Sequence, residues 1–134
     1  MHETSIVNSI FKTLEQEFNS DKLNKMSGVY LKVGILSNIE PRLLYNAYEA
    51  FHLTNPNYHN TKLHIEMSEI KIQCEDCNHV TDVKNYRFLC DQCQRPTKNI
   101  IQGEEMLIHK VEFDDQLQAQ KDTLLQFIFL KTKS

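Results

Sequence analysis

The chain has 134 residues, enough for one core of ordinary size and a small added module but too few for two full domains. Fifteen basic and eighteen acidic side chains give a net charge of −3, and the scattered Lys and Arg residues argue against a nucleic-acid partner. The start of the chain lacks the basic and apolar regions of a secretory signal, and no apolar run reaches membrane-spanning length. We therefore expect a cytoplasmic protein that does not bind a membrane.

The first element that we expect is a helix over residues 4–19. Its apolar side chains recur at the spacing that places them on one face, namely Ile6, Val7, Ile10, Phe11, Leu14 and Phe18. Turn-forming residues then crowd the stretch 19–28. After it, apolar residues alternate with the period of two that is typical of a strand, at Val29, Leu31, Val33 and Ile35.

A second helix is expected to begin at Pro41, because the first helical position does not need the N–H that proline lacks. The buried side predicted for this helix consists of Leu43, Leu44, Ala47, Tyr48 and Phe51. Asparagines and Pro56 end the helix in a loop over residues 55–60. A second strand then covers residues 62–74, and its apolar residues change parity at Ser68 and Glu69, which indicates a bulge or bend.

All the cysteines of the chain follow this strand, in the two motifs CEDC and CDQC, at Cys74, Cys77, Cys90 and Cys93. Two residues between cysteines let both sulfurs reach one ion around a tight turn, and two such turns supply a tetrahedral zinc site. The twelve residues between the motifs are long enough for an antiparallel hairpin that brings them together. Two disulfides and a thioredoxin-type redox motif are the alternatives, but a redox motif needs no second copy and nothing marks export.

A zinc ion held by four thiolates has no open coordination position, so this site is expected to be structural and not catalytic. After it, residues 106–113 are predicted to form a strand that returns to the same sheet, with Leu107, Val111 and Phe113 on one side. The tail beyond residue 114 fits a helix or a final strand. We favour a tail that covers part of the sheet over one that docks a partner or forms a dimer.

These elements predict an α+β fold: a small mixed sheet of about three strands packed with two helices, plus an inserted zinc-ribbon or knuckle module. We expect an α+β domain over residues 1–73 and 99–134, interrupted by a zinc-binding module over residues 74–98. The zinc knuckle is thereby held away from the helices.

The first three residues, Met1, His2 and Glu3, form a compact nitrogen chelator. Initiator methionine is usually trimmed only before small side chains, so Met1 and its free amine are expected to stay. This amine, the His2 amide and the His2 imidazole can close adjacent chelate rings around one ion, with Glu3 or a water completing the plane. Square-planar nitrogen donors suit Ni(II) or Cu(II), whereas zinc takes the thiolates. A solvated terminal histidine is the alternative that chemistry alone favours.

The combination of these features resembles the HypA/HybF family of nickel-incorporation proteins. The resemblance covers about residues 1–113 and rests on segments that occur in the family's order and spacing. They are MHETS at the N-terminus, VYLKVGILSNIEP leading into LLYNAYEAF, the motifs CEDC and CDQC, and GEEMLIHKVEF.

The resemblance implies a non-enzymatic nickel metallochaperone, with Ni(II) as transient cargo and Zn(II) as structural metal. It makes His2 the essential nickel ligand and Glu3 a nearby contributor, and it assigns the four cysteines to zinc. The expected partners are the nickel GTPase HypB and the large subunit of [NiFe]-hydrogenase, with urease maturation proteins as further candidates. Monomer and weak homodimer both stay open, and the resemblance says nothing of the tail.

The sequence argues against two other functions. A zinc-ribbon scaffold that binds nucleic acid or a transcription complex is opposed by the acidic balance of the chain. A zinc hydrolase of the HExxH type is opposed by Ile6, which stands where the second histidine would be. His79, two residues after Cys77, is able to exchange with a thiolate at the zinc, but a solvated loop histidine is the favoured interpretation. Surface or half-buried roles are expected for His52, His59, His64 and His109.

Overall fold

The computed structural model describes residues 3–115 and 120–129, the second segment by its backbone alone. Its elements in chain order are α1 (Glu3–Glu17), α2 (Ser20–Asn24), β1 (Met26–Gly34), η1 (Ile35–Ser37), α3 (Pro41–Thr54), η2 (Pro56–Tyr58), β2 (Lys62–Ser68), β3 (Lys71–Gln73), β4 (Val80–Asp82), β5 (Ile100–Gln102), β6 (Met106–Asp115) and β7 (Gln120–Phe129). None of the described helices is both long and apolar enough to cross a membrane.

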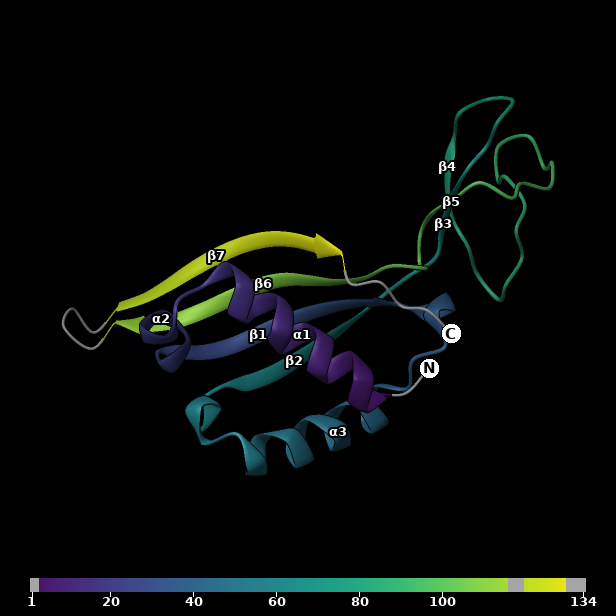
Figure 1. The fold of residues 1–134 in the computed structure, drawn as a ribbon. Helices are drawn as coiled ribbons and strands as arrows, with labels where there is room; N and C mark the ends of the chain where they lie inside the picture. The colour runs from purple at the N-terminus through teal and green to yellow at the C-terminus, as the bar shows by residue number, and fades with distance from the viewer. Residues whose placement is uncertain (1–2, 116–119, 130–134) are drawn as a thin grey trace.

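The elements form two units (Figure 1). The α+β unit consists of α1 to β2 together with β6 and β7, and its strands follow the order β2-β1-β6-β7. Strand β1 runs parallel to β2 and antiparallel to β6, so the sheet is mixed, as predicted. The second unit, which we call the cysteine module (residues 71–102), contains the three-stranded sheet β4-β3-β5. The predicted α+β class is confirmed, with one strand more in the main sheet than expected.

The core of the α+β unit lies between the sheet and the helices α1 and α3. The apolar face of α1 is buried there as predicted, through Ile6, Val7, Ile10, Phe11 and Leu14. The Phe11 ring packs 4.6 Å from Phe51 of α3 and 4.7 Å from Tyr58 of η2, measured between ring centroids. The hydroxyl of Tyr48 donates to the carbonyl oxygen of Thr61 at 2.5 Å, which connects α3 to the start of β2. Burial raises the pKa of Tyr48 to about 12.

Two residues do not lie on the faces predicted for them. Leu43 retains 44% of its surface, because the buried stripe of α3 passes through Leu44 and Tyr48 and leaves Leu43 on its flank. Leu107 does not share the helix-covered face with Val111 and Phe113. The register of β6 against β1 shifts by one residue between Lys110 and Ile108, so Ile108 takes the core position that strict alternation gives to Leu107.

Two elements differ from those expected. The turn-forming stretch after α1 contains the short helix α2, because the side chain of Asn19 accepts a hydrogen bond from the N–H of Lys22 and caps it. The single strand predicted over residues 62–74 is two strands, β2 and β3, which belong to different sheets. The parity change at Ser68 and Glu69 therefore marks the place where the chain leaves the main sheet for the cysteine module.

The tail forms strand β7, which pairs antiparallel with β6 at eight positions from Asp115↔Gln120 to Leu107↔Phe129. Of the two alternatives open from the sequence, the final strand is the observed one. Residues 116–119 of the tail lie outside the described residues. Strand β7 covers the edge of β6, so that β2 and β7 are the two edge strands of the described sheet.

Truncation after Asp115 is expected to lower the melting temperature, because it removes the backbone partner of β6 along that whole edge. The number of bound metal ions should not change, since the truncated residues supply none of the candidate ligands. Thermal melts of full-length and truncated protein, read together with the mass from light scattering, measure both effects. An unchanged melting temperature together with loss of a concentration-dependent dimer would contradict the pairing of β7 within its own chain.

Candidate metal centres

The four cysteines converge on one point within the cysteine module. Their sulfur atoms all lie within 4.8 Å of one another. The Sγ atoms of Cys74 and Cys93 are 3.5 Å apart, and those of Cys77 and Cys90 are 3.6 Å apart. A disulfide requires about 2.0 Å, whereas four sulfurs placed about 2.3 Å from one zinc ion lie about 3.8 Å from each other. The cluster therefore suits a structural zinc ion, and the disulfide alternative does not fit it.

Each cysteine motif forms the same turn. The carbonyl of the first cysteine accepts a hydrogen bond from the N–H of the residue four positions later. Asn78 donates to Cys74 at 2.9 Å, and Gln94 donates to Cys90 at 2.8 Å. Both Asn78 and Gln94 take left-handed backbone conformations, with φ of 63° and 65°. This reversal directs successive N–H groups toward the sulfur atoms. The sequence repeat CxxC therefore corresponds to a structural repeat around one centre.

The segment between the two motifs does not form the hairpin that its length suggested. Strand β4 pairs with β3 instead, so the hairpin surrounds the first cysteine turn. The second turn is closed by a bridge between Leu89 and Pro96. The remainder of the segment is a loop in which Asn85 and Tyr86 both have positive φ angles. The two motifs are thus brought together as two separate loops and not by the arms of one hairpin.

Side chains around the cluster connect one cysteine turn to the other. Arg95, which follows the second turn, lies 3.1 Å from the Asp76 carboxylate in the first. The buried hydroxyl of Thr81 on β4 accepts the N–H of Asp91 in the second turn at 3.1 Å. His79 Nε2 lies 2.6 Å from Asp91 Oδ1, so the ring faces a carboxylate. Exchange of His79 with a thiolate would require that contact to break.

Two of the four cysteine thiols have lowered pKa values and two have raised ones, and this difference favours a bound cation. The N–H groups of Cys77 and Asp76 lower the pKa of Cys74 to about 6, and the N–H of Cys93 lowers that of Cys90. Backbone N–H groups also lower the pKa of Cys77 and Cys93, but loss of solvation and the neighbouring thiols outweigh them, and the Cys77 pKa rises to about 12. Four sulfurs so close together do not all ionise unless a positive charge stands among them.

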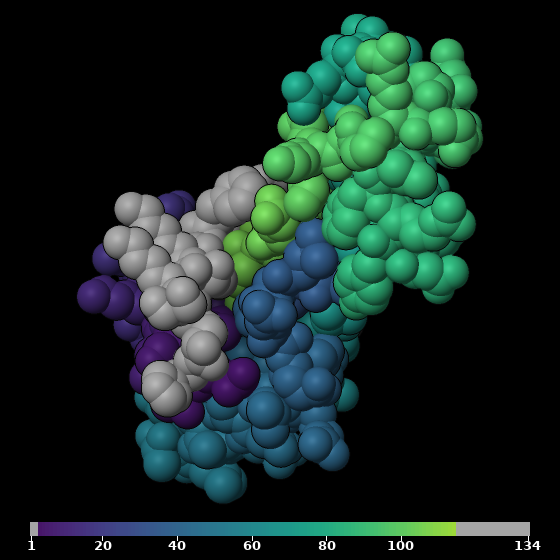
Figure 2. All heavy atoms as spheres, turned by 90° about the vertical axis from the view of Figure 1, so that its right-hand side faces the viewer, coloured from purple at the N-terminus to yellow at the C-terminus, as the bar shows by residue number. Residues whose placement is uncertain are grey.

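The predicted nickel ligands His2 and Glu3 stand at the start of the chain. His2 is outside the described residues. Glu3 is half-buried and is the first residue of α1, where a carboxylate is favoured by the positive end of the helix. Thr4 of α1 and Ala47 of α3 line one cavity, and both helices begin at the end of the α+β unit from which the cysteine module projects (Figures 1 and 2).

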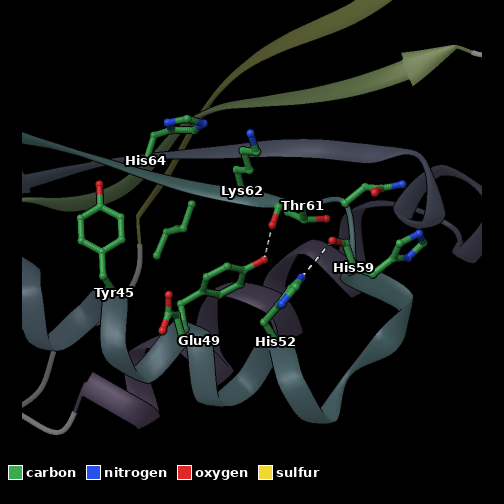
Figure 3. Close-up of a pocket in the computed structure, with 10 residues that line it drawn as sticks. Tyr45, Glu49, His52, His59, Thr61, Lys62 and His64 are labelled. Atoms are coloured by element: carbon green, nitrogen blue, oxygen red, sulfur yellow. Dashed lines mark hydrogen bonds between the residues drawn. The ribbon is translucent and has the colours of Figure 1, made fainter.

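The remaining histidines do not gather around a point. His52 and His59 line a groove of about 480 Å³ between α3 and β2 (Figure 3). Their ring nitrogens contact backbone carbonyls, His52 that of His59 at 3.1 Å and His59 that of Pro56 at 3.0 Å. His64 stacks on Tyr30, with ring centroids 4.3 Å apart. Within residues 3–115, the cysteine cluster is the one group of three or more potential ligands that is close enough to hold a metal ion.

The model of the protein family described as "Hydrogenase/urease nickel incorporation, metallochaperone, hypA" matches residues 1–113. The chain belongs to the HypA family. The resemblance inferred from the sequence motifs is thereby confirmed, and the family is one of hydrogenase maturation factors and nickel metallochaperones. The match between this chain and the family model begins at the first residue of the chain and includes both cysteine motifs.

Individual HypA proteins are similar over almost their whole length. The hydrogenase maturation factor HypA of Helicobacter hepaticus is 32% identical over 117 residues, which cover 87% of this chain and 99% of the relative. That of Campylobacter jejuni is 34% identical over 106 residues, covering 79% and 93%. The solution structure of the Ni metallochaperone HypA from Helicobacter pylori aligns with a TM-score of 0.59 at 27% identity, covering 84% of this chain and 97% of that one. A second HypA solution structure aligns with a TM-score of 0.64 at 26% identity, covering 84% and 96%. The HypA match ends at Phe113, so strand β7 lies beyond it.

Proposed function

We propose that this protein binds Ni(II) at its N-terminus and delivers it during the maturation of [NiFe]-hydrogenase. His2 is the principal nickel ligand in this proposal and Glu3 a contributor, while Cys74, Cys77, Cys90 and Cys93 hold a structural zinc ion. The observation that carries the proposal is the family match, which starts at residue 1 and therefore includes the Met-His-Glu start. Nickel is cargo and no bond of a substrate is broken, so we propose no enzymatic activity.

The two sets of ligands support separate binding sites for the two metals. Zinc favours thiolates in tetrahedral surroundings, and the cysteine cluster offers four sulfurs at suitable spacing. An imidazole and backbone nitrogens suit the square-planar geometry of Ni(II). A carrier must also release its cargo. A site at the end of the chain exchanges its ion faster than an enclosed one, because solvent reaches the ligands.

The proposed handover partners are the nickel GTPase HypB and the hydrogenase large subunit. Urease, which the family description also names, is a second proposed recipient. We further propose a cytoplasmic protein, monomeric or weakly dimeric, with a nickel-binding unit over residues 1–73 and 99–134 and a zinc-binding insertion over residues 74–98. A nucleic-acid scaffold finds little support, because Lys71 and Arg95 of the cysteine module are paired with Asp82 and Asp76.

Hydrogenase maturation in a strain that lacks its own copy of the gene tests the proposal. The variant His2→Ala should fail to restore hydrogenase activity at low nickel, and added nickel should partly restore it, because the defect is one of delivery. His59→Ala, which changes an exposed histidine in the groove beside β2, is the matched control and should behave as the parent. Normal maturation by His2→Ala at low nickel would overturn the proposal.

A further inference from the structure

The cysteine module is joined to the α+β unit by two short crossings of the chain. One leads from β2 to β3 through Ser68, Glu69 and Ile70, and the other leads from β5 to β6 through residues 103–105. Beside the cysteine module, one hydrogen bond joins the two stretches of chain: the side chain of Gln102 in β5 donates to the carbonyl of Glu69 at 2.9 Å. Two crossings with no cross-link near the sheet would let the module swing.

Glu105 supplies the cross-link beside the main sheet. Its carboxylate accepts the hydroxyl of Ser68 at 2.5 Å on one crossing and the N–H of Gly103 at 2.7 Å on the other. Ser68 is buried and Glu105 half-buried, so water competes weakly for these bonds. Partial burial raises the pKa of Glu105, but the Ser68 hydroxyl, backbone N–H groups and Lys32 together lower it below its ordinary value. The carboxylate is therefore charged at neutral pH.

Residues 103 and 105 of the second crossing also bind the segment that leads from β1 to α3. The carbonyl of Glu105 accepts the N–H of Gly34, and the carbonyl of Gly103 accepts the N–H of Leu36, each at 2.7 Å. A Cβ atom on Gly34 would lie 2.0 Å from the Gly103 oxygen, so the two backbones are in direct contact. Residues 34–40 then enter α3, and Ala47 in its second turn lines a cavity together with Thr4 at the start of α1. The contacts at residues 103–105 thus connect the cysteine module to the end of the fold where α1 begins (Figure 1).

We propose that Glu105 is a positioning residue that locks the two crossings together and so holds the cysteine module in one orientation relative to the N-terminal end of the α+β unit. A carrier that presents nickel and zinc units to the same partner needs them at a fixed relative position. This role in delivery rests on the proposed function. The orientation itself does not, because it depends on contacts within the chain alone.

Residual dipolar couplings of the zinc-loaded, nickel-free protein test the orientation. In the parent, one alignment tensor should fit the amides of both units. In Glu105→Ala the common tensor should be lost, and the cysteine module should need a separate and weaker one. Glu105→Gln should show an intermediate loss, because its amide keeps one acceptor and its NH2 group can donate to Ser68. Glu104→Ala, which removes an exposed carboxylate one residue away, should retain the common tensor.

A single common tensor in Glu105→Ala would overturn the proposal, and so would loss of the common tensor in Glu104→Ala. If Glu105→Ala does not fold, Ser68→Ala decides, since it keeps the charge and removes one bond; a common tensor as good as the parent's would then overturn the proposal. A second readout is hydrogenase maturation at low nickel, which should fall in Glu105→Ala and not in Glu104→Ala. Normal maturation despite a lost common tensor would overturn the role in delivery, whereas failure of the nickel proposal itself appears in His2→Ala.

Discussion

Replacement of Cys90 by alanine should release the zinc ion and unfold the cysteine module while the α+β unit stays folded. A module of this size buries too little apolar surface to fold alone, and zinc binding contributes on the order of 10–16 kcal/mol in small zinc modules. Three thiolates lose both the tetrahedral geometry and part of the charge that the ion needs. The core of the α+β unit contains no residue of the module, so its stability has a separate source.

Zinc content by metal analysis and amide hydrogen exchange by mass spectrometry measure this result. Protection should be lost over residues 71–102 and kept in α1, α3 and the strands of the main sheet. Gln92→Ala, an exposed substitution within the same turn, is the control and should retain zinc and protection. A Cys90→Ala variant that keeps one tightly bound zinc ion and its protease resistance would refute the four-thiolate assignment.

Replacement of Phe11 by alanine should lower the free energy of unfolding of the α+β unit by about 3–5 kcal/mol, the usual cost of truncating a buried aromatic residue. Phe11 is 1% exposed and packs against three aromatic rings of α3 and η2, those of Tyr48, Phe51 and Tyr58. These rings cannot close the cavity without moving α3. Urea unfolding of the zinc-loaded protein, followed by the signal of the α+β unit, measures the change.

Leu53→Ala on α3 is the control for Phe11→Ala, because Leu53 is 84% exposed and its loss should cost less than about 0.5 kcal/mol. Both variants should bind one zinc ion, since the cluster is outside this core. A change below about 1 kcal/mol in Phe11→Ala would show that the aromatic contacts of Phe11 do not anchor α1 to α3.

The parts of the fold that could be predicted are those governed by local periodicity. The apolar spacing of α1, the start of α3 at Pro41 and the alternation of β1 each depend on residues close in sequence, and all three elements are observed. The errors arise where tertiary contacts decide. The register shift beside Ile108 is imposed by pairing with β1, and the split of the 62–74 strand reflects two separate sheets.

The metal centre was predictable because the CxxC spacing itself constrains the geometry of each turn. The contacts around the metal centre could not be predicted from the sequence. The pairing of His79 with Asp91 and of Arg95 with Asp76 depends on how the two turns face each other. Glu105 stands in a segment that carried the family resemblance but gave no local sign of its bonds to Ser68 and Gly103. Side chains that connect two units through long-range contacts leave no periodic signal in the sequence.

The central claim is that nickel binds at His2 while zinc stays at the thiolates. Calorimetric titration of zinc-loaded protein with Ni(II), with absorption spectra recorded in parallel, tests it most directly at about pH 7.5, where protons compete little with an imidazole of ordinary pKa about 6.5. The parent should bind one equivalent without releasing zinc. His2→Ala should bind none, and a chain extended by one residue before Met1 should lose the same binding if the terminal amine is a ligand. One equivalent bound by His2→Ala as tightly as by the parent would contradict the account.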